Sequence, residues 1–181
     1  MKMTTSDFTT TLLVDKTPKE VFNAINNVRG WWSEEIEGST NKLNDEFKYH
    51  FDDIHRCRLK VIESIAEKKV VWLVMDNYFK PGIFDDASHK NNKVTNDKAE
   101  WTGTKISFEI SNPDSYREDN KTQIRFTHIG LVPEDECFDV CEEAWSTYIN
   151  ISLRGLITIG KGQPNRTGKP RTENEKKLVT K

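Results

Sequence analysis

Cysteine and histidine side chains are the residues of this sequence best suited to bind a metal ion. Cys137 and Cys141 lie four positions apart, so both thiols share one face of a predicted helix. Together with His50, His55 or His128 they could form a zinc site. The spacing is not that of a zinc knuckle, however, and small apolar cysteines are common in helix cores. We therefore expect no metal and no cofactor, and we expect His50 and His55 to face solvent or a turn.

His128 is the strongest candidate for acid–base chemistry. It lies beside Phe126 on the inward face of a predicted strand, and an inward histidine can act as a general base or as a polar group of a binding pocket. It can also be a core histidine that bonds a backbone carbonyl. We favour the core histidine because a binding cavity needs several convergent polar groups. We therefore expect no catalytic residue.

Acidic residues offer a second kind of acid–base site. Paired carboxylates catalyse proton transfer only where burial separates their pKa values. The candidates lie in predicted loops or on a polar strand face, where we expect solvent around them: Glu34, Glu35, Glu37, Asp52 and Asp53. The motifs of phosphate-binding loops, dinucleotide-binding domains, serine hydrolases and zinc metalloproteases do not occur in the sequence.

Two adjacent tryptophans, Trp31 and Trp32, form the most prominent aromatic feature. Neighbouring side chains of an extended chain point to opposite sides. We therefore expect one indole at the mouth of a cavity and the other over the short helix that precedes the pair. Plain core packing explains the pair equally well.

The composition excludes several classes of protein. Five Trp, four Tyr and nine Phe among 181 residues are too many aromatic residues for a disordered chain. No apolar run approaches the ~18 residues of a membrane span, and no signal peptide begins the sequence. Three cysteines and a net charge of -2 are typical of a reduced, cytoplasmic protein with no specific affinity for nucleic acid.

The spacing of apolar residues predicts the order of elements. A strand at 8–14 precedes Thr17-Pro18, which with Glu20 forms a capping-box start for a short helix at 18–27. Alternating polar and apolar residues then predict further strands. These strands cover 46–51, 57–61, 70–75, 101–110 and 122–131.

A long amphipathic helix completes the predicted domain. It begins at Pro133 and carries an apolar stripe that ends before Gly160. The segment 80–98, rich in Asn, Asp and Lys, is expected to be a long loop insertion. Residues 163–181 are basic and nearly free of apolar side chains, so we expect a disordered tail after a single domain at 1–162.

This order of elements predicts an α+β fold of the helix-grip type. A curved antiparallel sheet of six to seven strands wraps around the long C-terminal helix, because hairpin-linked strands cannot bury both faces alone. Short N-terminal helices close one edge. A cavity between the sheet and the long helix is the usual consequence of this architecture.

The sequence also resembles a known superfamily. The segment Val14–Phe22 is similar to the opening of START-like, or SRPBCC, domains, in which a strand ends in a Pro-x-Glu-Val-Phe helix start. Further similar segments are Arg29–Ser33, Trp101–Lys105, Thr127–Val132 and the Trp145–Leu156 helix. The combination most resembles the bacterial branch related to activators of the ninety-kilodalton heat-shock chaperone ATPase, the AHSA type. The resemblance covers about residues 8–162 and implies the fold of the birch-pollen allergens.

The resemblance leaves the activity open, since the superfamily includes lipid carriers, receptors, cyclases and chaperone regulators. We expect a small apolar or amphipathic ligand, bound without turnover. The expected ligand-binding residues are Trp31, Trp32, Tyr49, Phe51, Trp72, Phe108, Phe126, His128, Trp145, Tyr148 and Ser152. One alternative is a regulator that binds a chaperone through its surface. Another is a cyclase- or hydrolase-type enzyme that uses His128 in the same cavity.

Overall fold

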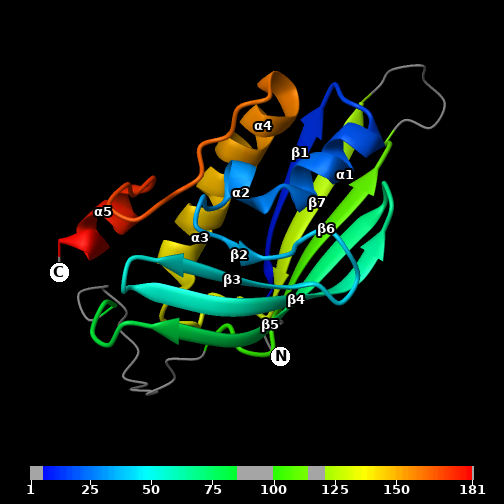
Figure 1. The fold of residues 1–181 in the computed structure, drawn as a ribbon. Coiled ribbons are helices and arrows are strands. Elements are labelled where there is room, and N and C mark those ends of the chain that lie inside the picture. Colours follow the sequence, from blue (N-terminus) through cyan, green and yellow to red (C-terminus); the bar gives the residue numbers. More distant parts are fainter. Residues whose placement is uncertain (1–5, 85–99, 114–120, 181) are drawn as a thin grey trace.

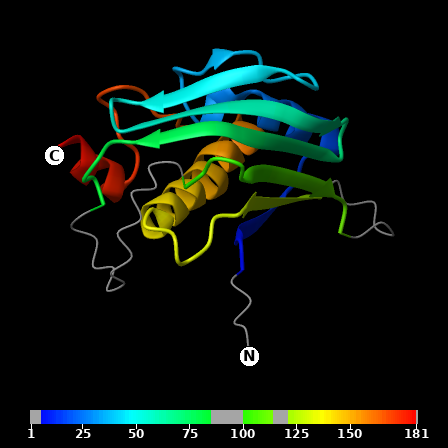
Figure 2. The same cartoon turned by 90° about the horizontal axis from the view of Figure 1, so that it is seen from below.

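The computed structural model describes residues 6–84, 100–113 and 121–180 of the chain. Seven strands form one antiparallel sheet in the order β1-β7-β6-β5-β4-β3-β2. The sheet curves around a long helical segment that crosses its concave face (Figures 1 and 2). The predicted helix-grip architecture is therefore confirmed.

The elements have the following bounds. The strands are β1 Phe8–Val14, β2 Glu37–Gly38, β3 Glu46–Phe51, β4 His55–Ile65, β5 Lys69–Phe79, β6 Lys105–Ser111 and β7 Thr122–Ile129. The helices are α1 Pro18–Asn26, α2 Val28–Trp31, α3 Phe138–Thr147, α4 Arg154–Ile159 and α5 Glu173–Val179, and Tyr148–Leu153 between α3 and α4 is a stretch of π-helix, η1. No described helix is long and apolar enough to cross a membrane.

Helix α1 begins where the capping box predicted. The Thr17 hydroxyl accepts the Glu20 amide N–H at 3.2 Å, and the Glu20 carboxylate accepts the Thr17 amide N–H at 2.9 Å. Each bond satisfies an N–H that the first helical turn leaves without a partner. The helix packs its buried face, which includes Val21 and Ile25, against the sheet core.

Strand β6 starts four residues later than its alternation predicted. Trp101–Thr104 form a turn, in which Thr104 donates both its amide and its hydroxyl to the Trp101 carbonyl, at 3.0 and 2.5 Å. The Trp101 carbonyl is thus bonded within the turn, and the regular ladder begins only at Lys105.

The long helical segment begins at Phe138, five residues after the predicted start at Pro133. The Glu100 carboxylate accepts the amide N–H groups of Glu136 and Cys137, at 2.8 and 3.1 Å. A distant side chain thus satisfies donors next to the helix start, which a local pattern cannot reveal. The π-helical η1 is equally invisible in the sequence, because its buried residues continue the apolar stripe of α3.

The prediction of a disordered tail is wrong for the described residues. Residues 163–180 run back along the domain, and α5 packs against α3 beside the end of β5 (Figures 1 and 2). Helix α5 has its own capping box, formed by Thr172 and Glu175. Asn165 joins the segment to the body, because its N–H donates to the Trp32 carbonyl at 2.9 Å and its carbonyl accepts the Glu34 N–H at 3.0 Å.

The physical reason for this error is the kind of contact that holds the segment. Its buried residues are isolated among charged ones and are mostly polar, namely Asn165, Thr172, Glu175 and Leu178. Hydrogen bonds rather than a hydrophobic stripe fix their positions, so neither composition nor periodicity marks them. Within the predicted 80–98 loop, Lys80 follows the end of β5 and 81–84 form a turn. Residues 85–98 lie outside the described residues.

Candidate functional site

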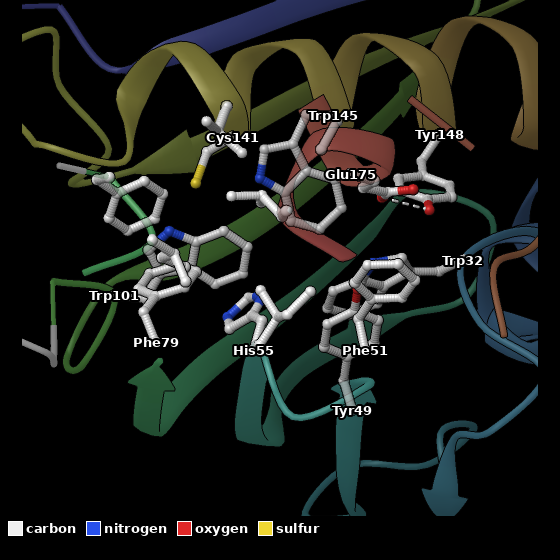
Figure 3. A pocket seen from close by; sticks show the side chains of 16 residues that line it. Trp32, Tyr49, Phe51, His55, Phe79, Trp101, Cys141, Trp145, Tyr148 and Glu175 are labelled. Carbon is white, nitrogen blue, oxygen red and sulfur yellow. Dashed lines mark hydrogen bonds between the residues drawn. The ribbon is translucent and has the colours of Figure 1, made fainter. Parts of the chain in front are cut away.

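A cavity of about 50 Å³ lies between the concave face of the sheet and the long helical segment (Figure 3). Strands β3 and β5, helix α3 and helix α5 all contribute to its wall. The lining residues are Trp32, Tyr49, Phe51, Ile54, His55, Phe79, Ile83, Phe84, Trp101, Val140, Cys141, Ala144, Trp145, Tyr148, Glu175 and Leu178. Most of these side chains are apolar or aromatic, and the polar ones are few.

Aromatic rings in near-parallel pairs make up much of the wall. The rings of Trp32 and Tyr49 stack with centroids 4.3 Å apart and planes 14° from parallel. Trp101 and Trp145 form a second pair, at 5.7 Å and 16°. Such offset stacks present flat, weakly hydrated faces. These pairs make the wall of the cavity largely apolar.

Five of the eleven predicted ligand-binding residues line this cavity. They are Trp32, Tyr49, Phe51, Trp145 and Tyr148. The other six are buried in the packed layer around it and do not reach its surface: Trp31, Trp72, Phe108, Phe126, His128 and Ser152. A side chain that points inward from the sheet therefore need not line the cavity, because most inward side chains of this sheet pack on one another. The prediction counted too many residues as lining residues.

The two adjacent tryptophans occupy different positions, as we expected. The reason is different, however, because the pair lies at the end of a helix and not in an extended strand. Trp31 ends the short helix α2, and the Trp31 and Trp32 rings stack at 19° with centroids 6.2 Å apart. The Trp31 indole N–H donates to the Ile25 carbonyl of α1 at 3.1 Å. Trp31 thus anchors the short helix, while Trp32 lines the cavity.

Both ring nitrogens of His128 are already used. The Trp145 indole N–H can only donate, and it donates to His128 Nδ1 at 3.0 Å. His128 Nε2 therefore carries the proton and donates to the Thr104 hydroxyl at 2.8 Å. Burial lowers the pKa of His128 to about 3, so the ring is neutral. This arrangement is that of a core histidine and leaves no ring nitrogen for a substrate.

His55 does not face solvent, and our expectation for it is wrong. It begins β4 on the inward face and lines the cavity, and its Nε2 lies 2.7 Å from Asn77 Oδ1. Since an amide oxygen only accepts, His55 Nε2 is the donor. Burial lowers the pKa of His55 to about 4. His55 is two residues before Cys57 and four before Leu59, so the alternation of this strand could have predicted its inward position.

A cluster of hydrogen-bonded polar groups occupies one end of the cavity. We call Tyr49, Tyr148, Asn165 and Glu175 the tyrosine cluster. The Asn165 amide donates to both phenol oxygens, at 3.0 Å to Tyr49 and 2.8 Å to Tyr148. The Tyr148 hydroxyl donates to Glu175 Oε1 at 2.7 Å, as Figure 3 shows. Asn165 and Glu175 were not predicted as site residues, because both lie in the segment that we expected to be disordered.

Burial controls the ionisation of this cluster. It raises the pKa of the Glu175 carboxyl and of both phenols. Glu175 Oε2 accepts the amide N–H groups of Arg171 and Thr172, at 2.5 and 3.2 Å, which partly offsets the cost of burying its charge. Among the described residues, no lysine or arginine pairs with Glu175.

Cysteine chemistry has no evident role in the described part of the chain. Cys57, Cys137 and Cys141 are all buried free thiols, and burial raises the pKa of Cys57 and Cys137. A raised pKa disfavours the reactive thiolate. No three His, Cys, Asp or Glu side chains within 6–84, 100–113 and 121–180 gather in a group that could hold a metal ion.

Ser152 holds helices together instead of lining the cavity. Its hydroxyl donates to the Trp31 carbonyl at 2.7 Å and accepts the Gln163 N–H at 2.6 Å. These two bonds connect the long helical segment, α2 and the C-terminal segment. Ser152 was among the expected ligand-binding residues, but its side chain does not reach the cavity.

Comparison with known proteins gives structural neighbours only. No protein-family profile and no curated protein sequence matches this chain. The solution structure of the Aha1 dimer from Colwellia psychrerythraea is 22% identical, with a TM-score of 0.62 over 87% of this chain and 99% of that one. A conserved protein of unknown function from Enterococcus faecalis is 13% identical, with a TM-score of 0.56 over 99% of this chain and 86% of that one. CalU16 from Micromonospora echinospora is 9% identical, with a TM-score of 0.52 over 82% and 73%.

The chain therefore shares the fold of the Aha1 structure and of the other two neighbours, as the sequence resemblance implied. At 22% identity the likeness to the Aha1 structure concerns the fold alone. One fold of this kind can carry several activities, so function has to be argued from the site.

Proposed function

We propose that this protein binds a small apolar or amphipathic molecule in the cavity between its sheet and its long helix, without turning it over. The observation that supports the proposal best is the wall itself, in which stacked aromatic rings surround a space with polar groups at one end. Binding sites for small molecules combine these two features. Each Å² of apolar ligand surface buried there would contribute roughly 25 cal/mol.

A ligand must displace protein groups to enter. The cavity holds about 50 Å³, whereas sites for drug-sized ligands hold roughly 300–1,000 Å³. Helix α5 supplies the wall residues Glu175 and Leu178, and it is only 7 residues long. So short a helix depends on its packing for stability. Displacement of α5 is therefore the least costly way to enlarge the cavity.

One polar group of the wall also lacks a partner. The Trp101 indole N–H is buried and makes no hydrogen bond within the described residues. A buried donor without a partner costs free energy. An oxygen atom of a ligand or of a water molecule in the cavity could accept a hydrogen bond from this N–H and so remove the cost.

Titration with the neutral fluorescent probe N-phenyl-1-naphthylamine tests the proposal. Leu178→Ala removes a side chain that holds α5 in place, so the fraction of open protein should rise and the probe should bind about tenfold more tightly or better. The matched control is Val179→Ala, because Val179 is 41% exposed and lies outside the wall. Saturable binding at one site, strengthened only by the Leu178 change, supports the proposal. Failure of the probe to bind either variant would refute it.

A second candidate function is regulation of a chaperone ATPase through the protein surface. Its support is the similarity to the Aha1 structure. The acidic residues after the tryptophan pair are surface groups for such contacts, but two of them already have partners within the protein. Glu34 pairs with Arg166 at 3.6 Å, and Glu35 accepts the Thr167 hydroxyl at 2.8 Å. Stimulation of a purified chaperone ATPase, unaffected by filling the cavity, would favour this candidate over ligand binding.

A further inference from the structure

Helix α5 places two chemically different side chains into the cavity. Leu178 contributes an aliphatic group to the apolar wall, and Glu175 contributes a carboxylate that bonds to Tyr148. Figure 3 shows Glu175 and Tyr148 together at the end of the cavity away from Cys141 and Trp101. The segment of the protein that closes the cavity is thus itself amphipathic, with one carboxylate and one apolar group.

Two phenols oriented by one amide lie beside this carboxylate, and Tyr148 bonds to it. Both phenol oxygens lie within 3.0 Å of the same Asn165 amide nitrogen, which donates to each of them. The phenol protons must therefore point away from Asn165. The proton of Tyr148 goes to Glu175, and that of Tyr49 has no acceptor among the described residues. A phenol that accepts a hydrogen bond is also a stronger donor.

This pair of donors belongs to the body of the protein and does not depend on α5. Tyr49 lies on β3 and Tyr148 on η1. Asn165 is fully buried and bonded through its backbone to Trp32 and Glu34. The chain between Asn165 and α5 includes Gly168 with a φ of 72°, where the backbone can turn freely. If α5 moves away, the two phenols and the amide remain at the mouth of the apolar cavity.

The charge around the cluster selects among anionic groups. No lysine or arginine of the described residues pairs with Glu175, and Glu143 on α3 opposes its ionisation. Neutral donors can hold a single delocalised charge, whereas a doubly charged group would be buried without a cation. The cluster therefore suits a carboxylate better than a phosphate monoester.

We propose that the natural ligand is an amphipathic monocarboxylic acid that replaces α5 in the cavity. Its apolar body would occupy the space of Leu178 against the aromatic wall. Its carboxylate would take the place of Glu175 on Tyr148 and would also accept the proton of Tyr49. This inference rests on the proposed function, because it concerns the same cavity. Glu175 and Leu178 then act as an internal competitor that keeps the site closed until such a ligand is present.

Binding of 2-naphthoate and of its neutral analogue 2-naphthamide tests the inference. The full chain carrying Leu178→Ala, in which α5 is loosened, should bind the acid at least tenfold more tightly than the amide. Adding Tyr148→Phe should reduce that preference about tenfold, because a hydrogen bond to a charged group is lost. Val179→Ala should leave both affinities as in the unchanged protein.

The ratio of the two affinities is the decisive quantity, since loosening of α5 changes both affinities alike. Where Tyr148→Phe fails to fold, as judged by its thermal midpoint, Tyr49→Phe serves as the second variant and should also lower the ratio. Equal affinity for acid and amide in Leu178→Ala would overturn the inference. In that event, retained binding of N-phenyl-1-naphthylamine would leave the proposed function intact, and loss of that binding would refute both.

Discussion

Acidification should destabilise this protein strongly, because two neutral histidines are buried in its core. Burial lowers the pKa of His128 to about 3 and that of His55 to about 4. In the unfolded chain both would titrate near 6.5. The unfolded state therefore binds more protons below that pH, so stability is fully present above about pH 6.5 and is lost as the pH falls toward the folded pKa values.

The size of the effect follows from these pKa differences. Between about pH 7.5 and about pH 4.5 each histidine should remove about 2.5 kcal/mol of the unfolding free energy, or about 5 kcal/mol together. That is a large share of the roughly 5–15 kcal/mol that a domain has in total. Burial raises the carboxyl pKa values of Glu175 and Asp135, which acts in the opposite direction and reduces the net loss.

Urea unfolding at a series of pH values measures this loss directly. His128→Asn should lower the stability at pH 7.5, because Trp145 and Thr104 lose their ring partner. It should also flatten the pH dependence by up to about 1.4 kcal/mol per pH unit near pH 5, since one fewer group titrates on unfolding. An unchanged slope in His128→Asn would refute the assignment of His128 as a buried, neutral ring.

Three further predictions concern the C-terminal segment and its contacts. Deleting 163–181 should lower the thermal midpoint by more than about 5 °C, because the segment carries buried contacts, and a shift within two degrees would show that it does not dock. Glu175 has a raised pKa, so α5 docking should be strongest below about pH 4.5 and weaken as the pH rises. N-phenyl-1-naphthylamine should then bind the unchanged protein more tightly as the pH rises toward neutral. Its affinity for Glu175→Gln should lack this increase. Ser152→Ala should cost about 1–3 kcal/mol of unfolding free energy through two lost hydrogen bonds, with little effect on probe affinity.

The sequence contained most of the fold, because local patterns determine most of its elements. The alternation of Phe47, Tyr49 and Phe51 predicted the inward face of β3, and all three side chains are buried. The Thr17–Glu20 capping box predicted the start of α1 at Pro18, where the helix begins. Patterns of this kind involve neighbours along the chain, so a single sequence displays them.

The sequence did not contain the features that depend on distant partners. Glu100 fixes the approach to α3 from across a long gap in sequence, and no periodicity connects the two. The C-terminal segment was missed for the same reason, since Asn165 meets Tyr49 and Tyr148 only in the folded chain. The extent of the cavity wall was overestimated because inward direction does not tell which side chains meet a void.

Filling the cavity is the most direct test of the claim that it binds a ligand. Ala144 lines the wall on α3, so Ala144→Leu in the Leu178→Ala chain would place a larger side chain in a space of about 50 Å³. Glu142→Leu adds the same side chain at an exposed position of the same helix and serves as the control. We expect Ala144→Leu to abolish binding of N-phenyl-1-naphthylamine and Glu142→Leu to leave its affinity unchanged, with both proteins folded. Equal probe binding by the two variants would contradict the account.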